Sequence, residues 1–366
     1  MQGRKPEPWC DTAQKAVDLE HMETNRLKSS LVSVFFVATC ASAKLGGKLL
    51  PVPVAFSSPE TGIGGGAKLR WQDPYDKPGF ADITAYTTQK VQSHMDVEVM
   101  RDSLDGIWRL NGYGEFGKFP GKWFGHGNPP EDSLASIYTP VYVGGWFSAS
   151  RWLDGGWLVG IKGTLENWDI HNDHLGIHRT ERFTGEKGGL EANIGIEVTR
   201  EGRDLATHPK NGSYLKLSVQ TSVPGTDFEW QNLTLDASQT VTFSDITAVV
   251  RGHHEEVWGS VPFWRTPFLG WRKSLRGLPD KRLRGNVAQC LGTEARWNTA
   301  IKWLQPALFG EIGKAGGHTE VWTADVNWAA GAGCRFPLAE GKAVLRVDYG
   351  WSEVGSGLYV DFGHAF

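Results

Sequence analysis

Apolar and polar residues alternate along the chain from about residue 44 to its end. In one stretch Leu215, Leu217 and Val219 fall on one face, while Lys216 and Ser218 fall on the other. A period of two places successive side chains on opposite faces of a β-strand. No stretch of comparable length has the helical period, so the sequence predicts an all-β protein.

Sixteen segments carry this alternation, and turns rich in Asp, Gly and Pro separate them. An even number of antiparallel strands, with about 20 residues for each strand and its connection, is typical of outer-membrane barrels. One connection, at about 260–285, is long and has no strand pattern, which indicates a functional loop. The predicted strands are 50–57, 62–72, 79–89, 94–103, 107–117, 138–151, 156–169, 188–200, 213–223, 228–243, 246–259, 286–299, 306–315, 326–337, 342–352 and 357–366.

Two β architectures could produce the alternation. A soluble sandwich buries its apolar face between two sheets, whereas a membrane barrel turns that face to lipid and its polar face to a lumen. The composition favours the barrel, because only 40% of the residues are hydrophobic while 46 glycines, 17 tryptophans and 17 phenylalanines are present. In hydrocarbon, strands satisfy their backbone groups only as a closed sheet. We therefore expect a transmembrane antiparallel β-barrel of about 16 strands in the bacterial outer membrane.

The charge balance and hydropathy exclude two other classes. Lys and Arg total 38 against 41 Asp and Glu, for a net charge of −3. A nucleic-acid binder needs a basic surface for the phosphate backbone, so nucleic acid is not an expected partner. No run of 18 apolar residues is present, so the sequence predicts no membrane-spanning helix.

The first 43 residues have a different pattern. Arg26 and Lys28 precede an apolar run at 31–38, and Ala41-Ser42-Ala43 follows it. This order is that of a secretory signal peptide, with a short buried helix as the alternative. Met22 is a natural start for such a signal, so residues 1–21 are predicted to be an over-extended gene start or a disposable leader. The barrel is expected to occupy residues 44–366.

The chain ends on an aromatic residue. Counting back by twos from Phe366 gives His364, Phe362, Val360 and Leu358 on one face of the last predicted strand. A terminal aromatic on an alternating apolar face resembles the assembly signal of bacterial outer-membrane barrels. Phe366, Phe362 and Val360 are therefore predicted to form such a signal, although His364 departs from the usual apolar residue. The alternative is a strand that happens to end in Phe.

Several motifs resemble one family. Leu275-Arg276-Gly277-Leu278 resembles the [VL]-R-G-[FY] signature of the BamA/TamA-type barrels, the bacterial surface antigen family, with Leu278 in place of an aromatic residue. The ordered set of matches covers essentially all of 50–366. The further matching segments are 58–62 (S-P-E-T-G), 124–128 (F-G-H-G-N), 200–212, 292–297 (E-x-R) and 307–313 (F-x-E-x-G).

The resemblance implies a lumen loop lock made of Arg276, Gly277, Glu294 and Glu311. In that family the long loop folds into the lumen and its arginine pairs with acidic residues on the wall. The alternation places Cys290, Glu294 and other even-numbered residues of that strand on one face, so Glu294 points inward. A guanidinium offers a forked donor to carboxylates in a partly dehydrated lumen. The alternative is that Arg276 is a solvated loop cation.

The expected function is binding and remodelling. The resemblance implies a barrel that assists the insertion or organisation of outer-membrane proteins or lipids where its first and last strands meet. Family members that assemble proteins usually carry POTRA domains before the barrel, and the few residues after Ala43 leave no room for one. A periplasmic partner would then supply that module, or the protein does not work in that way. The alternatives are a passive diffusion channel, a barrel enzyme that acts on lipid, and a scaffold for a soluble partner.

No catalytic, cofactor or metal site is predicted. The G-x-G-x-x-A pattern at 62–67 continues as a strand, although a dinucleotide site needs a helix there. The chain has no G-x-S-x-G element, so an enzyme is not expected. Cys290 and Cys334 are expected on opposite faces, which argues against a disulfide. Two polar runs could bind metal but more simply are solvated, namely His171, Asp173, His174 and His178, and His253, His254, Glu255 and Glu256.

Overall fold

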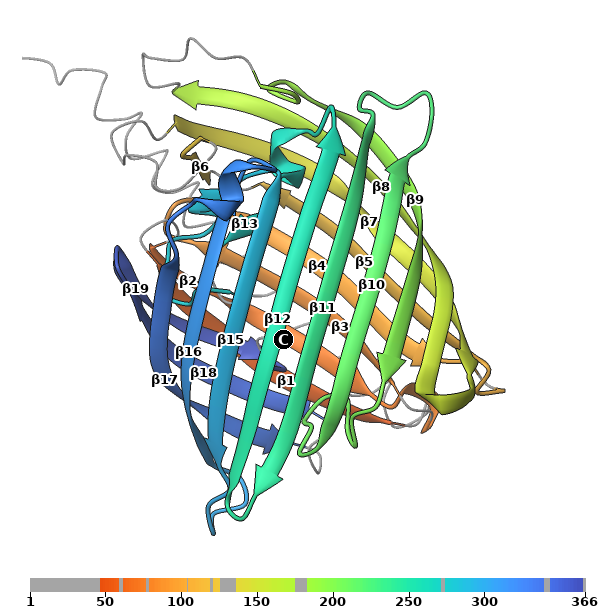
Figure 1. The fold of residues 1–366 in the computed structure, drawn as a ribbon, viewed down its shortest axis with the longest axis vertical. Coiled ribbons are helices and arrows are strands. Elements are labelled where there is room, and N and C mark those ends of the chain that lie inside the picture. The colour runs from red at the N-terminus through yellow and green to blue at the C-terminus, as the bar shows by residue number, and fades with distance from the viewer. Residues whose placement is uncertain are drawn as a thin grey trace, which may run out of the picture.

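A computed structural model describes most of the chain from residue 47 onward. The described residues are 47–58, 62–76, 79–103, 105–118, 121–125, 136–174, 183–270, 274–338 and 343–364. The predicted leader at 1–43 and the terminal Phe366 lie outside this set. Strands wind around a common axis into one barrel (Figure 1). Among the described residues no helix has the length and apolar character to cross a bilayer.

The all-β prediction of about 16 strands is confirmed. A short β6 (Gly121–Trp123) and a two-stranded hairpin of β13 (Phe268–Leu269) and β14 (Leu283–Arg284) accompany the long strands. The long strands are β1 (Lys48–Ser58), β2 (Gly62–Gln72), β3 (Gly79–Thr88), β4 (Ser93–Asp102), β5 (Trp108–Lys118), β7 (Ser136–Leu153), β8 (Trp157–His174), β9 (Gly188–Glu201), β10 (Gly212–Ser222), β11 (Trp230–Phe243), β12 (Ile246–Gly259), β15 (Val287–Trp297), β16 (Gln305–Gly316), β17 (Asn327–Leu338), β18 (Ala343–Ser352) and β19 (Gly355–Phe362).

Most strand boundaries fall within two residues of the predicted ones, and the largest differences are at the ends of β8 and β19. The extension of β8 runs beside its partner β7. Both strands have 18 residues, and β8 continues to His174 where the sequence predicted a polar loop. The two strands continue to hydrogen-bond each other past the apolar part, with one register shift between Ile137 and Thr139. Polar residues can extend a strand when its partner extends with it, because the ladder supplies the backbone pairing.

Each long strand pairs antiparallel with its neighbours in sequence, and β1 meets β19 to close the sheet. The seam between β1 and β19 has one register pair among the described residues, Ser57 with Leu358. By comparison, β1 and β2 share eleven pairs and β18 and β19 share eight. Among the strands that the structure describes, this seam is therefore the junction with the fewest paired residues.

The two faces of the wall have opposite character. Apolar side chains such as Ile161, Ile196 and Leu308 are exposed on the outer face, as are tryptophans near strand ends, including Trp157 and Trp328. The inner face holds charged side chains that are almost fully buried. This is the reverse of a soluble protein and is what a lipid-facing barrel requires.

The end of β19 corrects one prediction. Val360 lies on the outer side in partial exposure next to exposed Leu358, but His364 does not continue their face. β19 ends at Phe362, and Gly363 has a φ of +81°. This left-handed residue turns the chain, and the His364 ring stacks on that of His208, with Nδ1 of His208 2.9 Å from Nε2 of His364.

Candidate functional site: the inserted loop and its anchors

The connection between β12 and β15 folds into the barrel. It holds a short 3-10 turn, η4 (Phe263–Arg265), and the β13–β14 hairpin. Gly259 and Gly270 have φ values of +92° and +116°, and Pro262 and Pro267 cannot donate to a ladder, so the strand pattern breaks here. The described parts of this inserted loop are 260–270 and 274–286.

Arg276 binds three acidic side chains of the wall. Its Nη1 donates to Asp348 Oδ2 at 2.6 Å and to Glu294 Oε2 at 3.4 Å, and its Nη2 donates to Glu311 Oε1 at 3.1 Å. The Arg276 backbone N–H also donates to Glu311 Oε2 at 2.8 Å. The guanidinium lies over the ring of Phe309, 3.4 Å from its centroid. Arg276 is only 1% exposed, so it is not a solvated loop cation.

These acidic partners stabilise the protonated form of Arg276. Burial alone would lower its pKa, but Glu311, Glu294 and Asp348 outweigh burial and raise the pKa above the ordinary value. The guanidinium therefore stays protonated. The structure brings Arg276 together with both predicted carboxylates and adds Asp348, which the sequence did not reveal.

Further arginines bind the same carboxylates of this buried network. Arg335 donates to Glu294 Oε2 at 2.7 Å and also pairs with Asp348, while Arg251 donates to Glu311 Oε1 at 2.8 Å. A buried charge is stabilised only when it is paired and hydrogen-bonded. The residues come from β12, β15, β16, β17 and β18, so the network ties the inserted loop to five neighbouring strands.

Gly277 makes the close approach of the loop to the wall sterically allowed. Its φ is +113°, and a Cβ there would lie 2.7–2.9 Å from backbone atoms of Gly350 and Trp351. A Cβ on Gly350 would in turn lie 2.4 Å from the carbonyl oxygen of Arg276. The Gly277 N–H donates to the hydroxyl of Tyr359 on β19 at 3.0 Å. Backbone therefore packs on backbone at the tip of the loop.

Arg265 holds the first part of the inserted loop to another region of the barrel wall, formed by β8 and β9. It contacts Glu166 Oε1 on β8 and Glu191 Oε1 on β9, each at 2.7 Å, and Trp264 Nε1 donates to the same Glu191 oxygen at 3.1 Å. Burial alone would lower the pKa of Arg265, but Glu191 and Glu166 outweigh it and raise the pKa. Glu166 and Glu191 are direct cross-strand partners, and two like charges so placed need a cation between them.

Sequence reasoning missed Arg265, although one signal was present. Glu166 and Glu191 both occupy inward positions of predicted neighbouring strands. A strand register would have shown them opposite each other, which predicts a basic partner from elsewhere in the chain.

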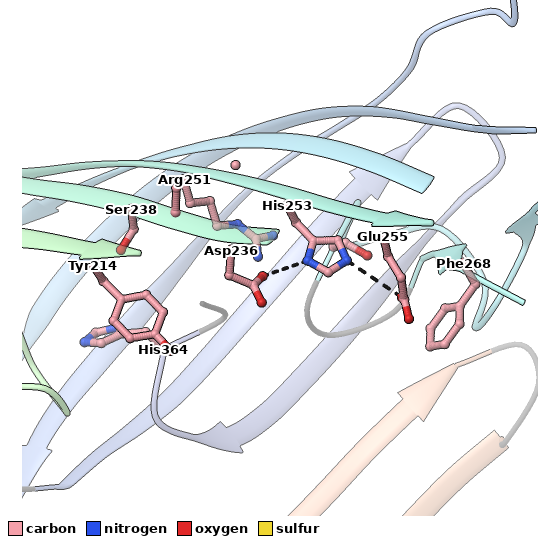
Figure 2. Close-up of a pocket in the computed structure, with 11 residues that line it drawn as sticks. Tyr214, Asp236, Ser238, Arg251, His253, Glu255, Phe268 and His364 are labelled. Carbon is pink, nitrogen blue, oxygen red and sulfur yellow. Dashed lines mark hydrogen bonds and ion pairs between the residues drawn. The ribbon is translucent and has the colours of Figure 1, made fainter. Parts of the chain in front are cut away.

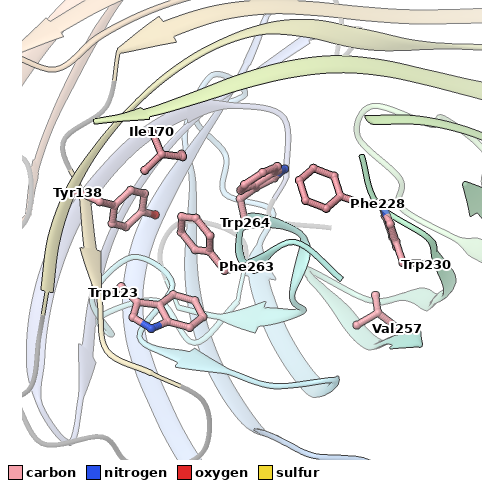
Figure 3. Close-up of a cluster of buried hydrophobic side chains, with 8 residues drawn as sticks. All are labelled: Trp123, Tyr138, Ile170, Phe228, Trp230, Val257, Phe263 and Trp264. Atoms are coloured by element: carbon pink, nitrogen blue, oxygen red, sulfur yellow. The ribbon is translucent and has the colours of Figure 1, made fainter. Parts of the chain in front are cut away.

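Aromatic side chains pack around this second anchor and fill the lumen at one end of the barrel (Figure 3). Phe263 lies edge-on to Trp123 and Tyr138, with ring centroids 5.2 and 5.0 Å away. Trp264 stacks on Trp168 at 5.1 Å and lies edge-on to Phe228 at 5.3 Å. Offset and edge-to-face pairs of this kind add packing energy to their buried area. The inserted loop thus bridges β8–β9 and β15–β18 across the lumen.

A cavity of about 430 Å³ lies beside the loop, lined by β10, β11 and β12 (Figure 2). His253 Nδ1 is 2.7 Å from Asp236 Oδ1, and its Nε2 is 4.0 Å from Glu255 Oε2. Ser238 lies on the far side of Asp236 from the His253 ring, so no Ser-His-acid triad forms here.

The predicted metal candidates are not assembled into sites among the described residues. The run His253–Glu256 is split by strand alternation, with His253 and Glu255 facing the cavity and His254 and Glu256 on the outer face. The described part of the chain has no group of three or more His, Cys, Asp or Glu placed to hold a metal ion. His171 and His174 lie at the end of β8 rather than in a loop, and His178 falls outside the described residues.

The fold and the site together define a class of protein, an outer-membrane β-barrel whose lumen is crossed by a loop held through a buried arginine. The chain belongs to the Omp85 superfamily, because the model of the Omp85 superfamily domain matches residues 158–366. This match includes the inserted loop and all partners of Arg276. Membership confirms the resemblance to BamA-type barrels and the location in the bacterial outer membrane.

Solved structures share the fold at low sequence identity. BamA from Haemophilus ducreyi lacking POTRA domains 1–3 is 11% identical, with a TM-score of 0.59 over 87% of this chain and 70% of that chain. CdiB from Acinetobacter baumannii is 14% identical, with a TM-score of 0.56 over 85% of this chain and 59% of that one. CdiB from Escherichia coli is 11% identical, with a TM-score of 0.61 over 85% of this chain and 62% of that one. No curated protein sequence matches the chain.

Proposed function

We propose that this barrel assists the insertion or organisation of outer-membrane proteins or lipids at the seam between β1 and β19. The observation that carries the proposal is the single register pair, Ser57 with Leu358, at that junction. Strands of a weakly paired edge expose backbone donors and acceptors that can pair with a strand of a client protein. The partners are then outer-membrane protein clients or lipids, and a separate periplasmic protein is a further candidate partner.

The lumen loop lock supports this proposal. Arg276, Gly277, Glu294 and Glu311 fix the inserted loop to the wall close to the seam, because Gly277 reaches Tyr359 on β19. We propose that the loop braces the lumen so that movement is confined to the seam. No catalytic residue and no cofactor are part of this function.

A disulfide introduced across the β1–β19 seam tests the proposal. Cysteines at Ser57 and Leu358, in a chain whose Cys290 and Cys334 are serines, should crosslink across β1 and β19. The crosslinked barrel should stay folded and fail to restore outer-membrane protein and lipid composition after depletion of the native protein. A crosslink between Val159 and Val198, which pair across β8 and β9, is the matched control and should preserve function. Full function with a crosslinked seam would exclude the proposal.

A further inference from the structure

A row of polar side chains crosses the outer face of three neighbouring strands. His254 on β12 is the register partner of Gln289 on β15, and Gln289 is the partner of Lys314 on β16. His254 follows the inward-facing His253, so its side chain lies on the side of the wall that meets the membrane. Gln289 and Lys314 lie on the same side, because register partners share a face of the sheet. Charged residues on a lipid-facing wall cost up to about 2–4 kcal/mol near the bilayer centre and little near the interface.

The polar row is organised by defined contacts. His254 Nδ1 lies 3.2 Å from Gln289 Nε2, and His254 Nε2 lies 3.4 Å from Glu256 Oε2. Glu256 Oε1 in turn lies 2.8 Å from Nδ1 of His318, whose ring stacks on the outward-facing Trp258. Tryptophan is enriched at the membrane interface, so the row lies near the level of lipid headgroups.

Lys314 brings to the row an ammonium group that has no carboxylate partner among the described residues. Its Nζ donates to the Trp322 carbonyl oxygen at 3.4 Å and lies 5.8 Å from the centre of the Trp322 ring. None of the ion pairs among the described residues involves Lys314, whereas Glu256 is already shared by His254 and His318. An ammonium held at the interface in this way attracts an anion.

An apolar depression adjoins the row. It has a volume of about 380 Å³, and its outward lining includes Leu235, Leu291, Ile312 and Val326. Gly252 lies in it and leaves space, because a Cβ added there would meet no atom within 4 Å. The depression thus offers apolar surface directly beside the lysine and the polar row.

We infer that this outer-wall surface binds a membrane lipid with an anionic phosphate headgroup. The phosphate contacts Lys314 and the amide of its neighbour Gln289, and an acyl chain lies in the depression beside Gly252. The barrel is an outer-membrane protein, so lipid is the molecule that surrounds this face. The site lies on β12–β16, away from the β1–β19 seam, and does not depend on the function proposed for the seam.

Native mass spectrometry of the full chain with added phosphatidylglycerol or phosphatidylcholine tests the inference. The wild type should retain the anionic lipid roughly fivefold or more over the zwitterionic one, because one charge-assisted contact is worth about that much. Lys314→Gln should abolish this preference. Gly252→Leu should lower retention of both lipids, since its side chain occupies the depression from a Cβ that meets no atom within 4 Å.

Lys118→Gln is the matched control, because Lys118 is an exposed lysine at the corresponding end of β5. It should leave the preference unchanged, and heat resistance on gels should show that all variants are folded. Inorganic phosphate should not displace the lipid, since it lacks an acyl chain. An equal loss in Lys118→Gln, no preference in the wild type, or full displacement by inorganic phosphate would each overturn the inference.

Discussion

Two arginines hold the inserted loop in different surroundings. Arg276 is 1% exposed and has three carboxylate partners, whereas the Arg265 side chain is 28% exposed and has two. Removing Arg276 takes a shared cation from three buried carboxylates at once, although Arg251 and Arg335 remain beside them, and this costs more than losing a partly solvated pair. Arg276 is therefore expected to dominate the stability of the loop.

We predict that Arg276→Ala lowers the free energy of unfolding by about 3–5 kcal/mol, because Glu311 and Asp348 lose a buried cation. The free energy of unfolding of Arg276→Lys should lie between those of the wild type and Arg276→Ala. An ammonium keeps the positive charge but cannot donate to two carboxylates as a planar guanidinium does. Heat resistance on gels and denaturant unfolding followed by tryptophan fluorescence measure the change. The exposed Arg151→Ala is the control. An unfolding midpoint of Arg276→Ala equal to that of Arg151→Ala would contradict the lock.

The Arg276 contacts could be predicted only in part. The family-like motif and the strand alternation pointed to Arg276, Glu294 and Glu311. Asp348 occupies an inward position on β18, but its contact with a loop residue 72 positions earlier depends on the three-dimensional path of that loop. Arg265 carries no motif, and its partners become evident only from the register of β8 and β9.

The strands themselves followed from the sequence because a two-residue period is a local signal. All sixteen long strands match predicted segments, since each must present apolar residues to lipid at every second position. The extension of β8 was missed because its end, His171 to His174, is a run of polar residues with no apolar alternation. The turn of His364 into the lumen was missed because it depends on the φ of Gly363.

The contact between His208 and His364 makes the end of the barrel sensitive to pH. His208 lies in the connection between β9 and β10, and His364 follows β19. Burial lowers the pKa of His208 to about 4, with Arg296, Lys210 and Arg335 acting in the same direction and Asp204 opposing them. Burial likewise lowers the pKa of His364 well below its usual value.

Acidification from about pH 6.5 to 4 should therefore destabilise the barrel. In this window the unfolded histidines bind protons that the folded ones do not, so the free energy of unfolding falls as the pH falls. The expected loss is on the order of 2 kcal/mol. Urea titrations at several pH values measure it, and His208→Gln should reduce the dependence by the share of His208, leaving that of His364. An identical pH profile in His208→Gln would show that other groups are responsible.

At the scale of the whole molecule, polarity is inverted across the wall. Apolar side chains face outward, and charged side chains are buried inside, where they need partners from the inserted loop. The loop supplies them at two places, Arg265 and Arg276, and aromatic rings fill the space between one anchor and the wall. The same loop that satisfies the buried charges therefore obstructs the lumen, which argues against a passive diffusion channel.

Single-channel recording in a planar bilayer tests the braced lumen most directly. The wild-type barrel should show small or no conductance, because the inserted loop is held to both walls. The double variant Arg265→Ala/Arg276→Ala should open frequently to a larger conductance, since neither anchor then holds the loop. A wild-type barrel that conducts steadily as an open pore, with no change in the double variant, would contradict the account.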